Sequence, residues 1–422
     1  MKQQIILREY SDEFHLSDYV LSPDEREYLT KISIIHESRP WERRFYFDEL
    51  QNGMRIKTQS WVGVIELNDV RIVIQPKFNE TFSALTDMIL FAEDLPYYQM
   101  ERTAGDINKT NFLEILIRLF LLETEKILKM GPVKEYVREN ENLRNMRGSV
   151  VFSENLKNNF NLPNRIYCQY DELVTNIMEN QVILSVLAAA SRFNVSAKTQ
   201  QHLNLMRAQF EMLCEEYRGV HWPTFHYNRL NKHYVNAHKI GHYLWRRSSA
   251  TSFLSNEEFH YSFLIDMNEL FEKFAGQFLM KYLPPEYQVI AGKRVTDAIT
   301  MEGTSYRHVI PDLIVKSKHT GDKKVIDVKY KQYGSKRVET SDVFQLAFYA
   351  QYNNQQSDVN YAATILYPQY AKDKQVKDIV IDLNSNSAFA GKLNVKSLNI
   401  EEILYYDKQG NRMYLETLAE SI

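Results

Sequence analysis

Short apolar runs that alternate with polar residues dominate the first part of the chain, which is the pattern of β-strands. The segment "WVGVIELNDVRIVIQPK" contains two β-branched runs on either side of Asn68-Asp69, and Pro76 closes the second run. Such runs flanking a short Asn-Asp turn are typical of a β-hairpin. We therefore expect residues 1–100 to form a β-rich domain.

The spacing of apolar residues changes from that of strands to that of helices after about residue 110. A helix is predicted from Asn111 through Lys129, where a Gly-Pro pair stops it, and another helical stretch runs from about Glu172 to Tyr217. The pattern therefore predicts a mainly helical middle region over residues 101–255.

A third pattern, "SNEEFHYSFLIDMNELFEKFAGQFLMKYLPPE", predicts a long helix that opens a C-terminal domain over residues 256–422. Ser255 and Glu258 have capping-box spacing, and the two prolines stop the helix. One broad buried stripe collects Phe263, Leu264, Met267, Leu270, Phe271, Phe274 and Phe278. Glu269 projects almost opposite this stripe, whereas Glu272 lies nearer its edge, where an acid can reach an active site. A lone Glu on a solvated flank is the more common alternative.

Two carboxylates interrupt the apolar strands of "VIPDLIVKSKHTGDKKVIDVKYK". If the hairpin turns around His319-Thr320, Asp312 lies across from Asp327. Strand alternation then places Lys329 on the same face as Asp327. A slip of one residue would destroy this arrangement, so the register is a sharp expectation.

Two neighbouring carboxylates on an apolar sheet repel one another, and a divalent cation would neutralise them. Oxygen ligands from Asp312, Asp327 and the backbone carbonyl of Val328 suit Mg²⁺, with Glu272 as the candidate ligand from the helix. Lys329 would then orient or deprotonate a water at the metal and stabilise a charged phosphate. The alternative is a surface hairpin with an ordinary Asp/Lys ion pair.

The stretch "TSDVFQLAFYAQY" predicts a further helix with Thr340 or Ser341 as its N-cap. Gln345 and Tyr349 are four residues apart and therefore lie on one face of it. Polar side chains with this spacing could contact the site or the substrate backbone.

Between Glu216 and Glu257 the chain contains no acidic residue, while basic residues, including Arg246 and Arg247, alternate with aromatic ones. Such a composition suits a surface that meets phosphates and stacks on bases, although a solvated connecting segment would look similar. His238 and His242 are four residues apart, as helical zinc ligands can be, but no acidic or cysteine ligand is near in sequence.

Composition limits the remaining possibilities. The chain has 422 residues, which predicts two or three domains, and a formal net charge of −3, which argues against a wholly basic nucleic-acid coat. Two cysteines give no disulfide framework or Cys-type zinc motif. The most apolar helical run is interrupted by Glu114 and Arg118, so we expect a cytoplasmic protein with no membrane span.

Together the helical acid, the Pro-Asp of one strand, the D-x-K of the next and the Q-x-x-x-Y helix resemble the PD-(D/E)xK nuclease superfamily. The chain is more closely similar to the McrC family, the nuclease subunit of McrBC-type restriction systems. The blocks "WVGVIELNDVRIVIQPK", "LRNMRGSVVFSENLKNN", "YDELVTNIMENQVI", "FLIDMNELFEKF" and "DVFQLAFYA" follow in that family's order. Asp327 stands where many superfamily members carry Glu, a substitution that the motif allows.

The resemblance implies an α+β multidomain protein whose C-terminal α/β nuclease domain has a mixed central sheet. It further implies a DNA endonuclease that uses Mg²⁺, with Mn²⁺ as a substitute, on double-stranded DNA. An oligomeric AAA+ GTPase or ATPase of the McrB type would be its partner, docked on the N-terminal region and stimulated by it. The chain has no G-x-x-x-x-G-K-[ST] motif and hence no P-loop of its own.

Two other functional classes fit parts of the pattern. A stand-alone RecB-like metal-dependent nuclease would share the catalytic motifs and cut DNA without a partner. A non-catalytic regulatory subunit would have a degenerate site, which the intact Asp312, Asp327 and Lys329 argue against.

Overall fold

The computed structural model describes residues 2–36, 38–77, 82–97, 112–247, 261–292, 295–301, 304–331, 333, 338–353, 361–369, 379–383 and 391–422. The chain divides into two compact units, one of Met1–Phe112 with Ser262–Ile422 and the other of Leu113–Tyr261. The predicted domain boundaries near residues 100 and 255 lie outside the described residues.

A four-stranded sheet forms the centre of the N-terminal part of the first unit. Its strand order is β1 (Gln3–Arg8), β8 (Val70–Gln75), β7 (Trp61–Glu66) and β12 (Tyr261–Asp266). β1 runs parallel to β8, and β7 pairs antiparallel with β8 in a register that places Glu66 opposite Arg71. The predicted hairpin around Asn68-Asp69 is therefore confirmed.

The edge between β7 and β12 depends on a glycine. Gly63 has a φ of +147°, and a Cβ at this position would lie 2.0 Å from the backbone oxygen of Phe263. Any other residue would push the two strands apart, so the glycine permits their close approach.

Shorter strands and two helices accompany this sheet, and α1 (Pro23–Ser33) helps to close an apolar core that includes Leu264 of β12. Helix α1 begins with a capping box between Ser22 and Glu25, and the second helix is α2 (Phe82–Ala92). The small sheets are β2 (Phe14–Ser17), β6 (Gly53–Thr58) and β5 (Phe45–Leu50), and β3 (Ile34–His36) with β4 (Arg39–Arg43). The prediction of a β-rich N-terminal region is confirmed for the described residues.

The expected helix from Ser255 to the two prolines is wrong in its first half. Residues 261–266 form strand β12, and helix α9 (Met267–Tyr282) begins only after Asp266, whose side chain caps it. Ser255 and Glu258 lie outside the described residues. A continuous apolar run such as Phe263 to Ile265 fits a buried strand as well as a buried helix, and periodicity alone does not separate the two.

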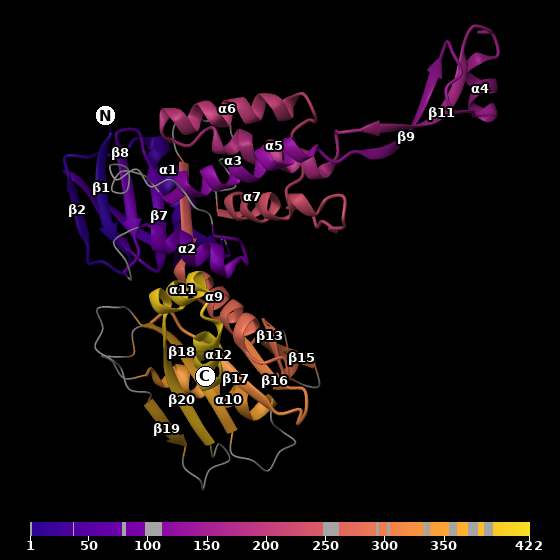
Figure 1. Cartoon of the computed structure of the whole chain (residues 1–422). Coiled ribbons are helices and arrows are strands. Elements are labelled where there is room, and N and C mark those ends of the chain that lie inside the picture. The colour runs from indigo at the N-terminus through magenta and orange to yellow at the C-terminus, as the bar shows by residue number, and fades with distance from the viewer. Residues whose placement is uncertain are drawn as a thin grey trace. The chain divides into compact units, whose positions relative to one another are not determined.

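The second unit combines helices with a narrow antiparallel sheet that the sequence pattern did not reveal. The helices are α3 (Phe112–Met130), α4 (Phe152–Asn159), α5 (Met178–Ala190), α6 (Ala197–Glu211) and α7 (Val235–Arg247), with a short 3-10 turn, η1 (Lys232–Tyr234), before α7. The strands are β9 (Glu135–Leu143), β10 (Ser149–Val150) and β11 (Ile166–Val174), in the order β10-β11-β9. Figure 1 shows β9 and β11 as a long ribbon with α4 at its far end.

Two sequence expectations for this unit are thereby decided. The helix predicted from Asn111 through Lys129 is confirmed as α3. The single helical stretch from Glu172 to Tyr217 is wrong, because its first residues belong to β11 and the remainder is split between α5 and α6. The exposed strand β9 has a polar sequence with no strand periodicity, so its pairing with β11 decides its conformation.

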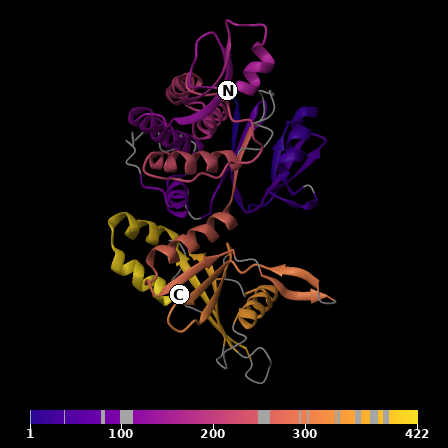
Figure 2. The same ribbon diagram turned by 90° about the vertical axis from the view of Figure 1, so that its right-hand side faces the viewer.

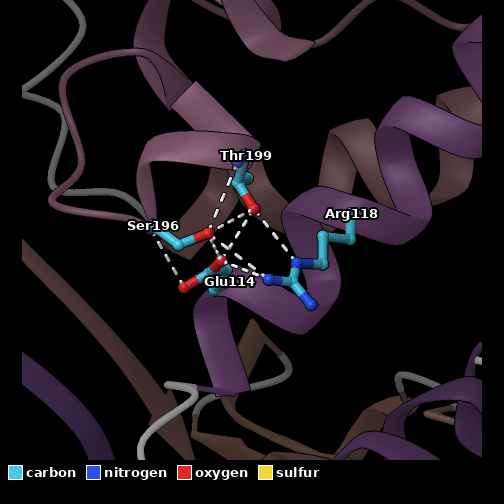
Figure 3. A network of polar contacts seen from close by, with 4 residues as sticks. All are labelled: Glu114, Arg118, Ser196 and Thr199. Atoms are coloured by element: carbon cyan, nitrogen blue, oxygen red, sulfur yellow. Dashed lines mark hydrogen bonds and ion pairs between the residues drawn. The ribbon is translucent and has the colours of Figure 1, made fainter. Parts of the chain in front are cut away.

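A partly buried polar network joins α3 to the start of α6 (Figure 3). Thr199 Oγ1 donates to Glu114 Oε1 at 2.7 Å, and Arg118 donates to the same oxygen at 2.8 Å. Ser196, the N-cap of α6, also donates to Glu114. Glu114 and Arg118, which interrupt the apolar run of α3, are thus structural in this unit.

The C-terminal part of the first unit is a six-stranded sheet flanked by helices. The strand order is β13 (Tyr287–Ala291), β16 (Leu313–Ser317), β17 (Lys323–Val328), β18 (Tyr361–Gln369), β20 (Gly391–Asn399) and β19 (Ile379–Leu383). A separate hairpin joins β14 (Val295–Met301) to β15 (Thr304–Val309). Strands β17, β18 and β20 are mutually parallel and the outer pairings are antiparallel, which confirms the expected mixed sheet.

Helices cover both faces of this sheet. They are α9, α10 (Thr340–Asn353), α11 (Ile400–Gln409) and α12 (Arg412–Ser421). Figure 2 shows α11 and α12 on the opposite side of the sheet from α10. An apolar cluster between α10 and the parallel strands includes Leu346, Ile365 and Val395. Strand β17, which contributes Val325 to this cluster, is therefore packed against α10 and also contacts α9.

Within the described residues, no helix combines the length and the apolar character that a membrane crossing requires.

Candidate functional site

The hairpin of β16 and β17 brings the two predicted aspartates together. Leu313 pairs with Ile326 in an antiparallel register, and the next step along that register places Asp312 opposite Asp327. The connecting turn is centred between His319 and Thr320, as the sequence predicted. The Asp312 carboxylate Oδ2 accepts a hydrogen bond from the backbone N–H of Val328 at 2.7 Å.

Lys329 closes the same cluster. Its Nζ lies 3.0 Å from Asp327 Oδ2 and donates to Oδ1 at 3.1 Å. The side chain of Asp327 is fully buried, whereas that of Lys329 keeps 21% of its surface exposed. The cluster thus joins a buried carboxylate to a lysine that still reaches solvent, which is unlike an ordinary surface ion pair.

Burial places a high electrostatic cost on the two carboxylates. The pKa of Asp312 is raised from 3.8 to about 7, chiefly by burial and then by the negative charge of Asp327. Burial also raises the pKa of Asp327, while Lys329 acts in the opposite direction. One ammonium group therefore compensates two buried carboxylates only in part, which leaves a local need for further positive charge.

The charge state of Lys329 limits what it can do. Burial alone would lower the pKa of this ammonium group, but the nearby charge of Asp327 and its hydrogen bond raise the pKa above its ordinary value. Lys329 therefore stays protonated near neutral pH, so of the two predicted roles the arrangement favours charge stabilisation and orientation over that of a base.

The two helical acids occupy different environments. Burial raises the pKa of Glu272, the negative charge of Glu269 adds to this, and Lys329 lowers it. Glu269 instead lies 3.9 Å from Lys273, which donates to Glu93 at 2.8 Å. Glu272 is thus the acid of α9 that lies in the electrostatic field of Lys329 and Asp327.

The donor set at this point fits a hard divalent cation. Carboxylate oxygens of Asp312 and Asp327, both in a surrounding that penalises their charge, are the ligand type that Mg²⁺ prefers. Among the residues that the structure describes, no three His, Cys, Asp or Glu side chains come together as a ready-made metal site. Besides these two side chains, a complete ligand set would need a backbone carbonyl such as that of Val328, water, and a rearrangement that brings Glu272 closer.

Comparison with known proteins decides the family. A sequence model of the McrBC 5-methylcytosine restriction system component matches residues 56–368, which is well over half of the chain. The chain belongs to the McrBC family. The match includes both aspartates, Lys329 and helix α10.

Solved structures show the same fold at low sequence identity. One chain of the refined half-complex from the tetradecameric assembly of Thermococcus gammatolerans McrB AAA+ hexamers with bound McrC matches with a TM-score of 0.62 and 16% identity. The match covers 97% of the present chain and 100% of that one. A chain of the Thermococcus gammatolerans McrBC complex matches with a TM-score of 0.50 and 19% identity, over 66% and 88% of the two chains. No curated protein matches the sequence.

Helix α10 of this McrBC-family chain presents the predicted polar pair. Gln345 Nε2 donates to Tyr349 Oη at 3.0 Å, so the two residues share one face. The Tyr349 ring also packs against the apolar cluster under α10. The amide of Gln345 is thereby held in a fixed orientation by a partly buried tyrosine.

The acid-free segment of the second unit forms part of a cavity of about 420 Å³. Its lining includes Trp222, Trp245, Arg192 and Arg246. Trp222 is stacked on the ring of His242, with centroids 5.2 Å apart. The predicted mixture of aromatic and basic side chains is therefore present, although the side chain of Arg247 lies outside the described residues.

The zinc interpretation of His238 and His242 is wrong. His238 is buried, its Nδ1 lies 2.9 Å from Tyr227 Oη and its Nε2 lies 3.0 Å from the Glu179 carbonyl oxygen. Both ring nitrogens are thus engaged, and burial lowers the pKa of His238 to about 4. A neutral core histidine has no remaining nitrogen with which to bind a metal.

Sequence reasoning missed the contacts that the N-terminal sheet makes with this region. Glu9 accepts a hydrogen bond from Tyr330, and Ser60 bonds the first turn of α9. The sequence gives little indication of these contacts, because an isolated Glu after a strand, such as Glu9, and a Ser before a strand, such as Ser60, are both common. These contacts join residues more than 200 positions apart.

Proposed function

We propose that the chain is a Mg²⁺-dependent DNA endonuclease subunit of a McrBC-like restriction system, with a PD-(D/E)xK nuclease domain at its C-terminal end. The observation that carries this proposal is the buried cluster of Asp312, Asp327 and Lys329. Burying two facing carboxylates destabilises a sheet, so their presence there is best explained by a bound cation.

In the proposed site, Asp312, Asp327, the carbonyl of Val328 and Glu272 hold the metal, and Mn²⁺ can replace Mg²⁺. When bound, the divalent ion polarises the scissile phosphate and makes water a stronger nucleophile. Lys329 places its ammonium group beside Asp327, where it binds a phosphate oxygen and stabilises the charge that develops during hydrolysis.

Substrate contacts are assigned to two other places on the chain. Gln345, held by Tyr349, presents its amide to the sugar-phosphate backbone near the cluster. In the second unit, Arg246 and Arg247 at the end of α7 bind double-stranded DNA through its phosphates.

We further propose that the chain works with an oligomeric AAA+ GTPase or ATPase of the McrB type and stimulates its nucleotide hydrolysis. Support comes from the family match and from the fold shared with a chain of the assembly of McrB AAA+ hexamers with bound McrC. The N-terminal β-rich region is the proposed docking region.

The assignment of partner docking to the N-terminal region and of cleavage to the C-terminal domain is tested with point variants in the full chain. A fragment ending near residue 250 lacks β12, the fourth strand of the N-terminal sheet, and a fragment beginning near residue 255 removes β12 from its neighbours. Either cut would expose apolar surface that the whole chain buries. Fragment activities would therefore mix loss of folding with loss of function.

Metal binding provides the direct experiment on the proposed site. Isothermal titration of the full chain with Mn²⁺ should show a site that Asp312→Ala and Asp327→Ala both eliminate. Lys329→Ala should keep metal binding but lose cleavage of DNA. An unchanged titration with either aspartate variant would overturn the assignment of the metal site.

A further inference from the structure

A buried carboxyl group of the N-terminal sheet contacts the segment that carries the proposed catalytic residues. Glu9 follows β1 and is 0% exposed. Its Oε1 accepts hydrogen bonds from Tyr330 Oη at 2.7 Å and from the backbone N–H of Lys77 at 2.7 Å. Tyr330 is itself 4% exposed and follows Lys329 directly.

Tyr330 also touches the helix that carries the candidate acid. Its ring centroid lies 5.9 Å from that of Phe271, the residue before Glu272. One side chain, fixed at its hydroxyl by Glu9, therefore lies against both the end of β17 and the face of α9. A displacement of Tyr330 would change the separation of Lys329 and Glu272.

A second, separate link holds the beginning of α9. The backbone N–H of Met267 donates to the carbonyl oxygen of Ser60 at 2.9 Å. Asn268 Nδ2 donates to Ser60 Oγ at 2.7 Å, and that hydroxyl lies 3.2 Å from Asp266 Oδ1. Ser60, at the start of β7, thus fixes the cap of the helix that carries Glu272.

The Glu9 link has a cost that simple packing would avoid. Glu9 Oε2 is buried and has no hydrogen-bond partner among the described residues. A buried carboxyl group with one unsatisfied oxygen destabilises a fold, and an apolar pair of similar volume would usually be more stable. A buried polar contact of this kind defines one orientation, which apolar contacts do not.

We propose that Glu9 is a positioning residue for the candidate nuclease site, which it orients through the hydroxyl of Tyr330. Ser60 likewise positions Glu272, through its hydrogen bonds to the first turn of α9. This inference rests on the proposed function. It assigns to the N-terminal sheet, beyond any docking of a partner, the task of setting the distance between the strand and helix halves of the site.

Hydroxyl deletion in the full-length protein tests the link. Tyr330→Phe removes the donor and keeps the ring. Tyr282→Phe is the matched control, because Tyr282 is 6% exposed and also donates to a carboxylate, that of Asp407, at the far end of α9. Glu9→Gln keeps an acceptor for Tyr330, whereas Glu9→Leu does not.

The first readout needs neither metal nor DNA. Amide hydrogen exchange over residues 326–331 of the metal-free chain should rise roughly ten-fold in Tyr330→Phe and Glu9→Leu, and stay near wild type in Glu9→Gln and Tyr282→Phe. Equal exchange in Tyr330→Phe and wild type would overturn the link, whatever the protein does with DNA.

The second readout is Mg²⁺-dependent DNA cleavage by the full-length chain together with its McrB-type partner. Tyr330→Phe and Glu9→Leu should lower kcat roughly ten-fold with KM changed less than about two-fold, and Glu9→Gln should recover most of the rate. Equal loss of rate in Tyr282→Phe and Tyr330→Phe would show that the Tyr330–Glu9 hydrogen bond only stabilises the fold and does not position the site. If wild type fails to cut while the exchange pattern is as expected, the proposed function is wrong but the link stands.

Discussion

Replacing Asp312 by asparagine removes one of two facing carboxylates and keeps the size of the side chain. The pKa of Asp312 is raised from 3.8 to about 7, chiefly by burial. A pKa difference of about 3 corresponds to about 4 kcal/mol, which is what ionised Asp312 costs the folded, metal-free chain above pH 7. Because the folded-state pKa lies above the unfolded one, this cost develops as the pH rises from about 4 to about 7.

The substitution should therefore stabilise the metal-free protein at pH 8. We expect Asp312→Asn to raise the free energy of unfolding by about 2 kcal/mol, less than the full cost because the amide must also be buried. Lowering the pH from 8 to 5 relieves about 3 kcal/mol in the wild type, so at pH 5 the gain should vanish or reverse.

Urea unfolding of the full chain in EDTA at pH 5 and pH 8 measures both values. Asp322→Asn is the matched control, since Asp322 is exposed in the same hairpin, and it should change stability by less than about 0.5 kcal/mol. Added Mg²⁺ should stabilise the wild type but not Asp312→Asn. A loss of stability at pH 8, or an equal gain at both pH values, would refute the electrostatic reasoning.

Three further variants test separate parts of the structure. Lys329→Met should abolish cleavage in a plasmid assay while Mn²⁺ still binds in calorimetry; a variant that cuts normally would remove Lys329 from the site. Glu272→Gln should lower the cleavage rate at least roughly ten-fold, and Glu269→Gln by much less, whereas equal small effects would mean that α9 supplies no ligand. Gly63→Ala should destabilise the chain by about 3 kcal/mol or more in urea unfolding, because its Cβ would lie 2.0 Å from a backbone oxygen of β12. Near-normal stability would contradict the pairing of β7 with β12.

The strand register around the site could be predicted because it depends on local chemistry. The polar turn and the apolar strands leave one pairing that keeps both apolar faces buried, and that pairing places Asp312 opposite Asp327. The preference for Glu272 over Glu269 likewise follows from helical spacing. These inferences need only neighbours in sequence.

Features that depend on distant partners could not be predicted in this way. The sequence of residues 261–266 predicts a helix, and only their pairing with β7 makes them a strand. Strand β9 is so polar that only its pairing with β11 identifies it as a strand. Glu9 and Tyr330 are 321 residues apart, and neither side chain is unusual in its own surroundings. Tertiary contacts override local propensity at each of these places.

Cleavage by an aspartate variant tests the proposed nuclease most directly. Plasmid DNA is incubated with Mg²⁺, the full-length chain and its McrB-type partner, with either wild type or Asp327→Ala. We expect wild type to cut and Asp327→Ala to leave the DNA intact while still binding the partner and stimulating its nucleotide hydrolysis. Cleavage by Asp327→Ala at the wild-type rate would show that the reaction takes place elsewhere.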